Sequence, residues 1–257
     1  MSVAWGTTPL ILAIIALISV NLLAFGRASL SPFGNVFLLT RVIYDGPGLD
    51  ALRRHCPAAG WRLCPFIGNM PALADDFLWR ADGPVAHAGG AKLVSRDADA
   101  ILTAALVAEP GTELLAFAGN SARQLVRFAS GDGLQSWPET VAPRIARHFP
   151  QFENAAFTGA RQSGGKLAVP PWLQSLHAAA GLIGIAGCCA LLLAAPRRDL
   201  ARSYAAVVLV TLLTNAAITG GLSGPHDRYQ SRIMWLPPLV AMLGATALRR
   251  TAIPAFT

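Results

Sequence analysis

Uncharged apolar runs alternate along the chain with segments of mixed polarity. Residues 8–26, 173–195 and 203–222 form three such runs, and each has close to the roughly 20 residues that cross a hydrocarbon core. A fourth run, residues 231–248, contains two adjacent prolines. This pattern predicts an all-α integral membrane protein with about four transmembrane helices.

The long segment between the first two runs, residues 28–172, has a different composition. It is rich in Pro, Gly and charged residues, and it is large enough to bury a core of its own. We therefore expect a mainly helical soluble domain inserted between the first and second transmembrane helices. Within it, apolar residues at helical spacing predict a helix with one apolar face and with Arg123 and Arg127 on its polar side; the apolar positions are Leu114, Phe117, Ala118, Ala122, Leu125 and Phe128.

The positive charge of the chain is concentrated beside the apolar runs. The net charge is +7, yet residues 28–172 hold 13 Lys and Arg against 12 Asp and Glu, whereas the remainder holds eight Arg against Asp199 and Asp227. Basic residues next to membrane spans indicate orientation and lipid headgroups. We therefore expect a lipid bilayer, and no nucleic acid, as a partner.

Two arginine clusters predict the orientation. One cluster, Arg197, Arg198 and Arg202, lies between the second and third runs, and the pair Arg249-Arg250 follows the fourth run. By the positive-inside rule both are cytoplasmic, which places residues 28–172 and the turn at 223–230 on the outer side and both termini in the cytoplasm. Nineteen Arg against two Lys, with abundant Ala and Gly, suggests a GC-rich bacterial gene. We therefore expect a multi-pass protein of the bacterial inner membrane with a periplasmic domain.

The first run has two interpretations. A cleaved signal peptide is one of them, but Met1 to Thr8 contains no Lys or Arg, and Ala24-Phe25-Gly26 is a poor cleavage site. A retained transmembrane helix fits these residues better.

The cysteines form two separate pairs. Cys56 and Cys64 lie in the segment expected outside the cytoplasm, where a disulfide between them is predicted to contribute about 2 to 3 kcal/mol. Cys188 and Cys189 lie within an apolar run and are expected to pack as small apolar residues. Because no Cys-x-x-Cys or paired His ligands accompany these residues, neither a metal site nor a cofactor is predicted.

The best candidate site is the charged turn between the third and fourth runs, since the chain contains no nucleophile elbow, P-loop or zinc-protease signature. Arginine offers a planar bidentate donor to phosphate, and lipid phosphates lie at the depth expected for this turn. The competing interpretation is a structural turn in which Asp227 pairs with an arginine. In addition, Pro237 and Pro238 are expected to kink the fourth helix and free backbone carbonyls. The candidate phosphate-binding residues are His226, Asp227, Arg228, Tyr229 and Arg232.

Two resemblances accompany these residues. Arg228-Tyr229 followed by an apolar run with Pro237-Pro238 resembles the last third of polytopic GT-C membrane glycosyltransferases, which use lipid-phosphate-linked sugars. The whole chain is similar to uncharacterised multi-pass inner-membrane proteins of Gram-negative bacteria, on the segments Asn35–Leu39, Asp75–Trp79, Arg123–Phe128 and Gly224–Gln230.

The chain departs from the GT-C pattern in two respects. Four spans are fewer than that class has, and Asp75-Asp76 lies roughly 50 residues beyond the first span, whereas the acidic motif of that class lies close to the membrane. Taken alone, this pair is more simply a solvated turn or helix cap than a catalytic site. The resemblance therefore implies the C-terminal part of such a protein, without its catalytic half.

The expected function is the handling of a lipid-linked or anionic cell-envelope component, with a polyprenyl-phosphate-linked or anionic lipid as ligand. The alternative is a non-enzymatic envelope scaffold whose periplasmic domain binds a protein partner. A transporter is a third interpretation, although the predicted spans lack charged residues within the membrane.

Overall fold

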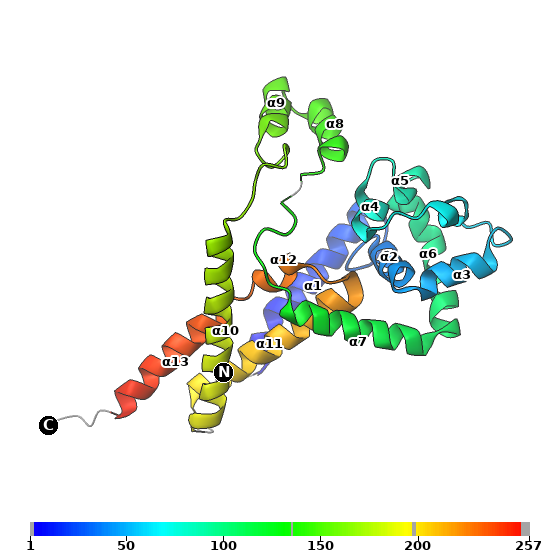
Figure 1. The fold of residues 1–257 in the computed structure, drawn as a ribbon. Coiled ribbons are helices and arrows are strands. Elements are labelled where there is room, and N and C mark those ends of the chain that lie inside the picture. Colours follow the sequence, from blue (N-terminus) through cyan, green and yellow to red (C-terminus); the bar gives the residue numbers. More distant parts are fainter. Residues whose placement is uncertain (1–2, 135, 197–198, 253–257) are drawn as a thin grey trace. The chain divides into compact units, whose positions relative to one another are not determined.

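A computed structural model describes residues 3–134, 136–196 and 199–252 (Figure 1). Every regular element in these ranges is a helix, as the apolar periodicity predicts. The chain divides into two compact units, Met1–Glu109 and Pro110–Thr257. The segment expected to form one inserted domain, residues 28–172, is therefore shared between two units, a division that the sequence analysis does not anticipate.

The first unit combines a long apolar helix with a small helical core. Its core is formed mainly by α2, α3 and α6, which bury Leu39, Leu52, Ile101 and Phe77 completely. The outer face of α6 carries Lys92 and Arg96, as expected for a helix in water. The helices of this unit are α1 (Val3–Phe25), α2 (Gly34–Asp45), α3 (Pro47–His55), η1 (Cys64–Asn69), α4 (Ala74–Trp79), α5 (Pro84–His87) and α6 (Ala91–Ala108).

The predicted pair of cysteines is joined in this unit. Cys56 follows the last residue of α3, Cys64 begins η1, and their sulfur atoms form a disulfide of 2.03 Å. The bond therefore ties η1 to the end of α3, next to the buried Leu52 and Leu63. Cys188 and Cys189 are free thiols on α10.

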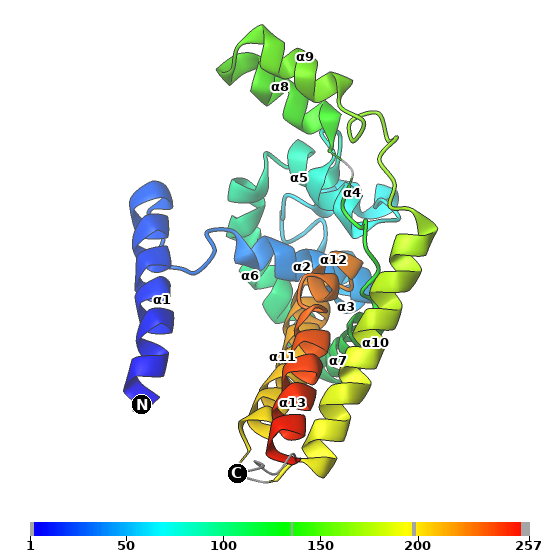
Figure 2. The ribbon, with the colours of Figure 1, turned by 90° about the vertical axis from the view of Figure 1, so that its left-hand side faces the viewer.

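The second unit contains the remaining helices. The helices α10, α11 and α13 pack side by side, and α7 lies against α11 (Figure 2). Close approach between α10 and α13 depends on glycine, because a Cβ added to Gly184 or Gly187 would collide with Pro238 or Ala241. The bounds are α7 (Pro110–Val126), α8 (Pro138–His148), α9 (Gln151–Gly159), α10 (Pro171–Ala194), α11 (Leu200–Ser223), α12 (Asp227–Ser231) and α13 (Leu236–Ala252).

Three helices are long and apolar enough to cross a membrane. They are the Thr7–Phe25 part of α1, α10 and α11, and only 6%, 22% and 33% of the residues in their most apolar stretches are buried. The bent pair α6 and α7 is also long and apolar enough when it is taken as one segment, which gives a fourth candidate. The helices are thus consistent with a multi-pass membrane protein. Arg197 and Arg198, which predict orientation, lie outside the described residues, as do the side chains of Arg249 and Arg250.

The fourth predicted span, residues 231–248, requires a correction. The short helix α12 ends at Ser231, a turn follows, and α13 begins at Leu236 with 17 residues. Pro237 and Pro238 therefore lie in the first turn of a helix, where their missing N–H groups cost nothing, and they do not kink a helix interior. The Ile233 carbonyl, predicted to be freed by the prolines, accepts the N–H of Leu236 at 3.1 Å.

Helix α7 also differs from expectation, in the face that it buries. A helix forms here but ends at Val126, before Arg127 and Phe128 of the predicted helix, and Leu114 and Leu125 are 69% and 37% exposed. The buried residues are instead Glu113, Asn120 and Gln124, which lie on a different side of the helix. The apolar face of α7 is therefore not a core face within the part of the chain that the structure describes.

Candidate functional site

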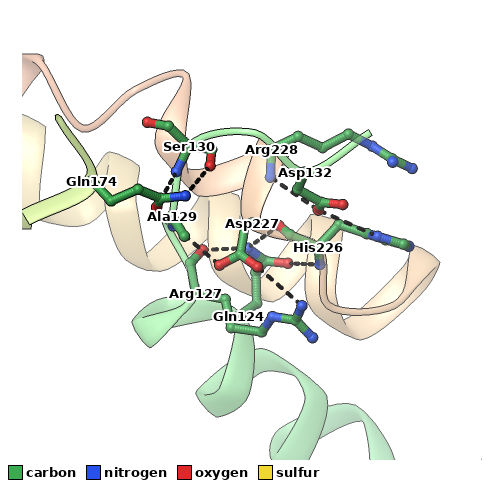
Figure 3. Close-up of polar contacts among 9 residues, drawn as sticks. All are labelled: Gln124, Arg127, Ala129, Ser130, Asp132, Gln174, His226, Asp227 and Arg228. Atoms are coloured by element: carbon green, nitrogen blue, oxygen red, sulfur yellow. Dashed lines mark hydrogen bonds and ion pairs between the residues drawn. The ribbon is translucent and has the colours of Figure 1, made fainter. Parts of the chain in front are cut away.

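The turn between α11 and α13 is fastened to the end of α7 by a buried amide. Gln124 is fully buried; its Oε1 accepts the backbone N–H of His226 at 2.8 Å, and its Nε2 donates to the His226 carbonyl at 2.9 Å (Figure 3). Because Gly220 has no Cβ, α11 approaches the Gln124 side chain closely. One side chain thus satisfies both backbone groups of the residue that precedes α12.

Asp227 is occupied by protein donors. Its carboxylate accepts from Arg127 Nη2 at 3.0 Å and from the backbone N–H of Ala129 at 3.1 Å. The Asp227 side chain is 20% exposed and that of Arg127 is 48% exposed. Asp227 therefore holds the chain after α7 against the first turn of α12, which is the role that the structural-turn interpretation assigns to it.

Asp132 supplies a second carboxylate on the other side of the turn. Its Oδ2 lies 3.5 Å from Nδ1 of His226 and accepts the backbone N–H of Arg228 at 3.3 Å. This contact is an ion pair only when the imidazole carries a proton. The His226 ring also meets the Tyr229 ring edge-on, with centroids 5.4 Å apart.

The loop that carries Asp132 is itself fixed to α10. The side chain of Gln174 accepts the Ser130 N–H at 3.2 Å and donates to the Ser130 carbonyl at 2.7 Å (Figure 3). This repeats the bridging pattern of Gln124 and His226. The candidate site is therefore built from α7, the following loop, α10 and α12.

Helix α11 supports the other side of α12 through the side chain of Asn215. Asn215 Nδ2 donates to the Tyr229 carbonyl at 3.0 Å and to Gln230 Oε1 at 2.7 Å. Gln230 is buried, and its Nε2 donates to the Leu212 carbonyl at 3.2 Å. At the end of α11, Gly224 adopts a φ of 109°, a conformation that suits glycine and lets the chain turn into α12.

Two arginines share the ring of Tyr229. The guanidinium carbons of Arg228 and Arg232 lie 5.2 Å and 5.5 Å from its centroid. Arg232 Nε donates to the Arg228 carbonyl at 3.0 Å, and the Tyr229 hydroxyl lies 3.2 Å from the hydroxyl of Ser223. Within the described ranges, no carboxylate forms a salt bridge with either guanidinium. The two guanidinium groups therefore keep donors for an external anion.

The structure gathers all five predicted residues but divides their roles. His226 and Asp227 face Asp132 and Arg127, which both lie in the segment after α7. Arg228, Tyr229 and Arg232 form the stacked group. The sequence analysis missed Gln124, Asp132 and Gln174. Arg127 appears there only on a polar helix face, and its partner lies 100 residues away in sequence, so local spacing carries no signal for the pair.

No group of three potential metal-ligating side chains occurs in the described ranges. Asp75 and Asp76 lie in the first turn of α4, where acidic residues favour the positive end of a short helix. This position fits the helix-start interpretation of the pair.

Comparison with models of known protein families, with curated proteins and with solved structures finds no match to this chain.

Proposed function

We propose that this multi-pass protein of the bacterial inner membrane binds a lipid-linked or anionic envelope component by its phosphate, through Arg228 and Arg232. The observation that carries the proposal is the pair of guanidinium groups stacked on Tyr229 without a carboxylate partner in the described ranges. Two adjacent guanidinium groups attract a phosphate strongly, because each donates charge-assisted hydrogen bonds. Stacking on one aromatic ring restricts both side chains before a ligand arrives.

The remaining residues of the turn position this pair. The Asp227 carboxylate accepts the backbone N–H of Ala129, and the Asp132 carboxylate accepts that of Arg228. Both carboxylates therefore already have hydrogen-bond donors within the protein. For this reason we propose binding, and no acid or base catalysis, for the turn. A transferase of the GT-C kind would need its catalytic acid from another segment.

Two further features support the proposed location. The disulfide between Cys56 and Cys64 is a bond that persists in oxidising compartments such as the periplasm. Trp172 at the start of α10 and Trp235 before α13 are 67% and 58% exposed, as expected for aromatic side chains at a membrane interface. We accordingly propose that the α12 turn lies at the outer membrane surface, with both termini in the cytoplasm.

Calorimetric titration of the full chain in detergent tests the proposal. The probes are geranyl phosphate, a short-chain phosphatidylglycerol and inorganic phosphate, which separate a prenyl phosphate, an anionic lipid and phosphate alone. Replacing Arg228 or Arg232 by Gln is expected to weaken binding about 10-fold to 100-fold, because a charge-assisted hydrogen bond contributes about 1.5–3 kcal/mol. Arg147→Gln, at an exposed position of α8, is the matched control.

Unchanged affinity in folded Arg228→Gln and Arg232→Gln variants would remove the proposal. In that case the scaffold alternative predicts that these substitutions change only the abundance of the protein. A protein partner would then bind elsewhere, and none of the three probes would bind with an affinity that depends on Arg228.

A further inference from the structure

Helix α7 buries three polar side chains and exposes most of its apolar ones. Glu113, Asn120 and Gln124 are 5%, 2% and 0% exposed, whereas Leu115 and Val126 are 76% and 72% exposed. At 100° per residue, the outward arc of the helix contains no charged or polar side chain. Its members are Gly111, Leu114, Leu115, Ala118, Gly119, Ala122, Leu125 and Val126.

The preceding helix provides a comparison within the same chain. Helix α6 buries Val94, Ile101 and Leu102 and turns Lys92 and Arg96 outward. This is the arrangement of a helix whose outer face contacts water. Because α7 has the reverse arrangement, water is an unfavourable neighbour for its outer face: burying each exposed Leu would gain about 1.5–3 kcal/mol.

The inward face of α7 is committed to α11 and the α12 turn. A Cβ on Gly220 would lie 2.7 Å from the Asn120 carbonyl oxygen, and one on Gly221 would collide with the Phe117 ring. Gln124 on the same face bridges His226. Glycines of α11 and the Gln124 amide therefore allow close packing here, as small and polar residues do between helices in a bilayer.

Helix α7 packs on a helix whose own surface is apolar. Helix α11 is one of the three candidate spans, and its Ile218 and Leu222, next to Gly220 and Gly221, are 55% and 48% exposed. Both helices of this packed pair thus expose apolar side chains. At the edge of the outward arc, Arg123 is exposed close to the end of the helix, where it can reach lipid phosphate.

We infer that the outer face of α7 is covered by the acyl chains of the bilayer, so that α7 is a membrane-embedded helix packed on α11. With 17 residues, α7 is about 25 Å long and shorter than a ~30 Å hydrocarbon core, so it does not form a complete span alone. This inference concerns residues 110–126 and does not depend on the ligand proposed for Arg228 and Arg232.

Fluorescence quenching in phosphatidylcholine vesicles tests the inference on the full chain. In a Cys188→Ala, Cys189→Ala background, Leu115→Cys and Val126→Cys are labelled separately with an environment-sensitive dye. The quenchers are a lipid with a doxyl group on its acyl chain and aqueous iodide. Val207→Cys on α11, 61% exposed, is the lipid-facing control, and Arg147→Cys on α8 is the water-facing control.

The doxyl lipid is expected to quench the dye at positions 115 and 126 as strongly as at position 207. Iodide is expected not to quench the dye at positions 115 and 126. Quenching by iodide, as at position 147, would overturn the inference. Protection from both quenchers together with a cross-linked dimer would also overturn it, because a second copy would then cover α7. Two labelled positions keep the test valid if one variant fails to fold.

Discussion

The side-chain amide of Gln124 forms hydrogen bonds with both backbone groups of His226, a residue 102 positions later in the sequence. Gln124 Oε1 lies 2.8 Å from the His226 backbone nitrogen, and Gln124 Nε2 lies 2.9 Å from the His226 carbonyl oxygen. This bridge joins α7 to the turn that carries the two stacked arginines. The stability of the candidate site therefore depends on a helix that the sequence assigns to a soluble domain.

Replacing Gln124 by Leu is expected to lower the free energy of unfolding by about 1–3 kcal/mol, because the N–H and carbonyl of His226 lose buried partners. Thermal unfolding of the purified protein in detergent measures this change. Gln151→Leu, at an exposed position of α9, is the matched control. Equal stability of the two variants would show that the bridge contributes nothing.

Gly220→Ala is expected to destabilise the packing of α7 on α11 by about 1–3 kcal/mol, since the new methyl group meets the backbone of Asn120. Gly119→Ala, on the outward side of α7 with open space around it, is expected to be neutral or stabilising by up to about 1 kcal/mol. Chemical unfolding in detergent compares the two. A Gly220→Ala variant as stable as Gly119→Ala would contradict the close approach of the helices.

The sequence predicts the bounds of α10 and α11 to within a few residues. An uncharged apolar run of about 20 residues has few possible structures other than a membrane-spanning or buried helix. It also predicts that the turn at 226–232 gathers its charged residues. It could not predict the face that α7 buries, since apolar periodicity shows that two faces differ but not which one contacts solvent. The partners Gln124 and Asp132 were missed because they depend on tertiary packing across about 100 residues.

Tyr44 provides a pH-dependent test of the first unit. Burial, with a smaller contribution from the Asp76 carboxylate, raises the pKa of Tyr44 from 10.0 to about 12, and its hydroxyl donates to the Pro71 carbonyl at 2.7 Å. Since the folded state holds this proton more tightly than the unfolded state, the stabilisation is complete below pH 10 and is lost as the pH rises towards 12.

Ultraviolet titration of the folded chain should therefore show a late tyrosine ionisation that Tyr44→Phe removes. The same substitution should flatten the loss of stability above pH 10. A titration curve that Tyr44→Phe leaves unchanged near pH 12 would contradict the burial of the Tyr44 hydroxyl.

The disulfide predicts a specific pattern of thiol labelling. In native membranes, Cys56 and Cys64 should resist maleimide until a reductant is added, because their sulfur atoms are bonded to each other. Replacing both by Ser should lower the free energy of unfolding by about 2–3 kcal/mol, the value expected for a short closed loop. Free, readily labelled Cys56 and Cys64 in an intact periplasmic preparation would argue against both the bond and the proposed orientation.

The most direct test of the proposed function compares two double variants in lipid nanodiscs. One is Arg228→Gln with Arg232→Gln, and the other is Arg144→Gln with Arg147→Gln on the exposed face of α8. Retention of radiolabelled polyprenyl phosphate and of phosphatidylglycerol is measured against empty nanodiscs. We predict that the first variant retains no more of either lipid than the empty nanodiscs, while the second retains as much as the wild-type chain. Equal retention by both variants, with both folded, would contradict phosphate binding by Arg228 and Arg232.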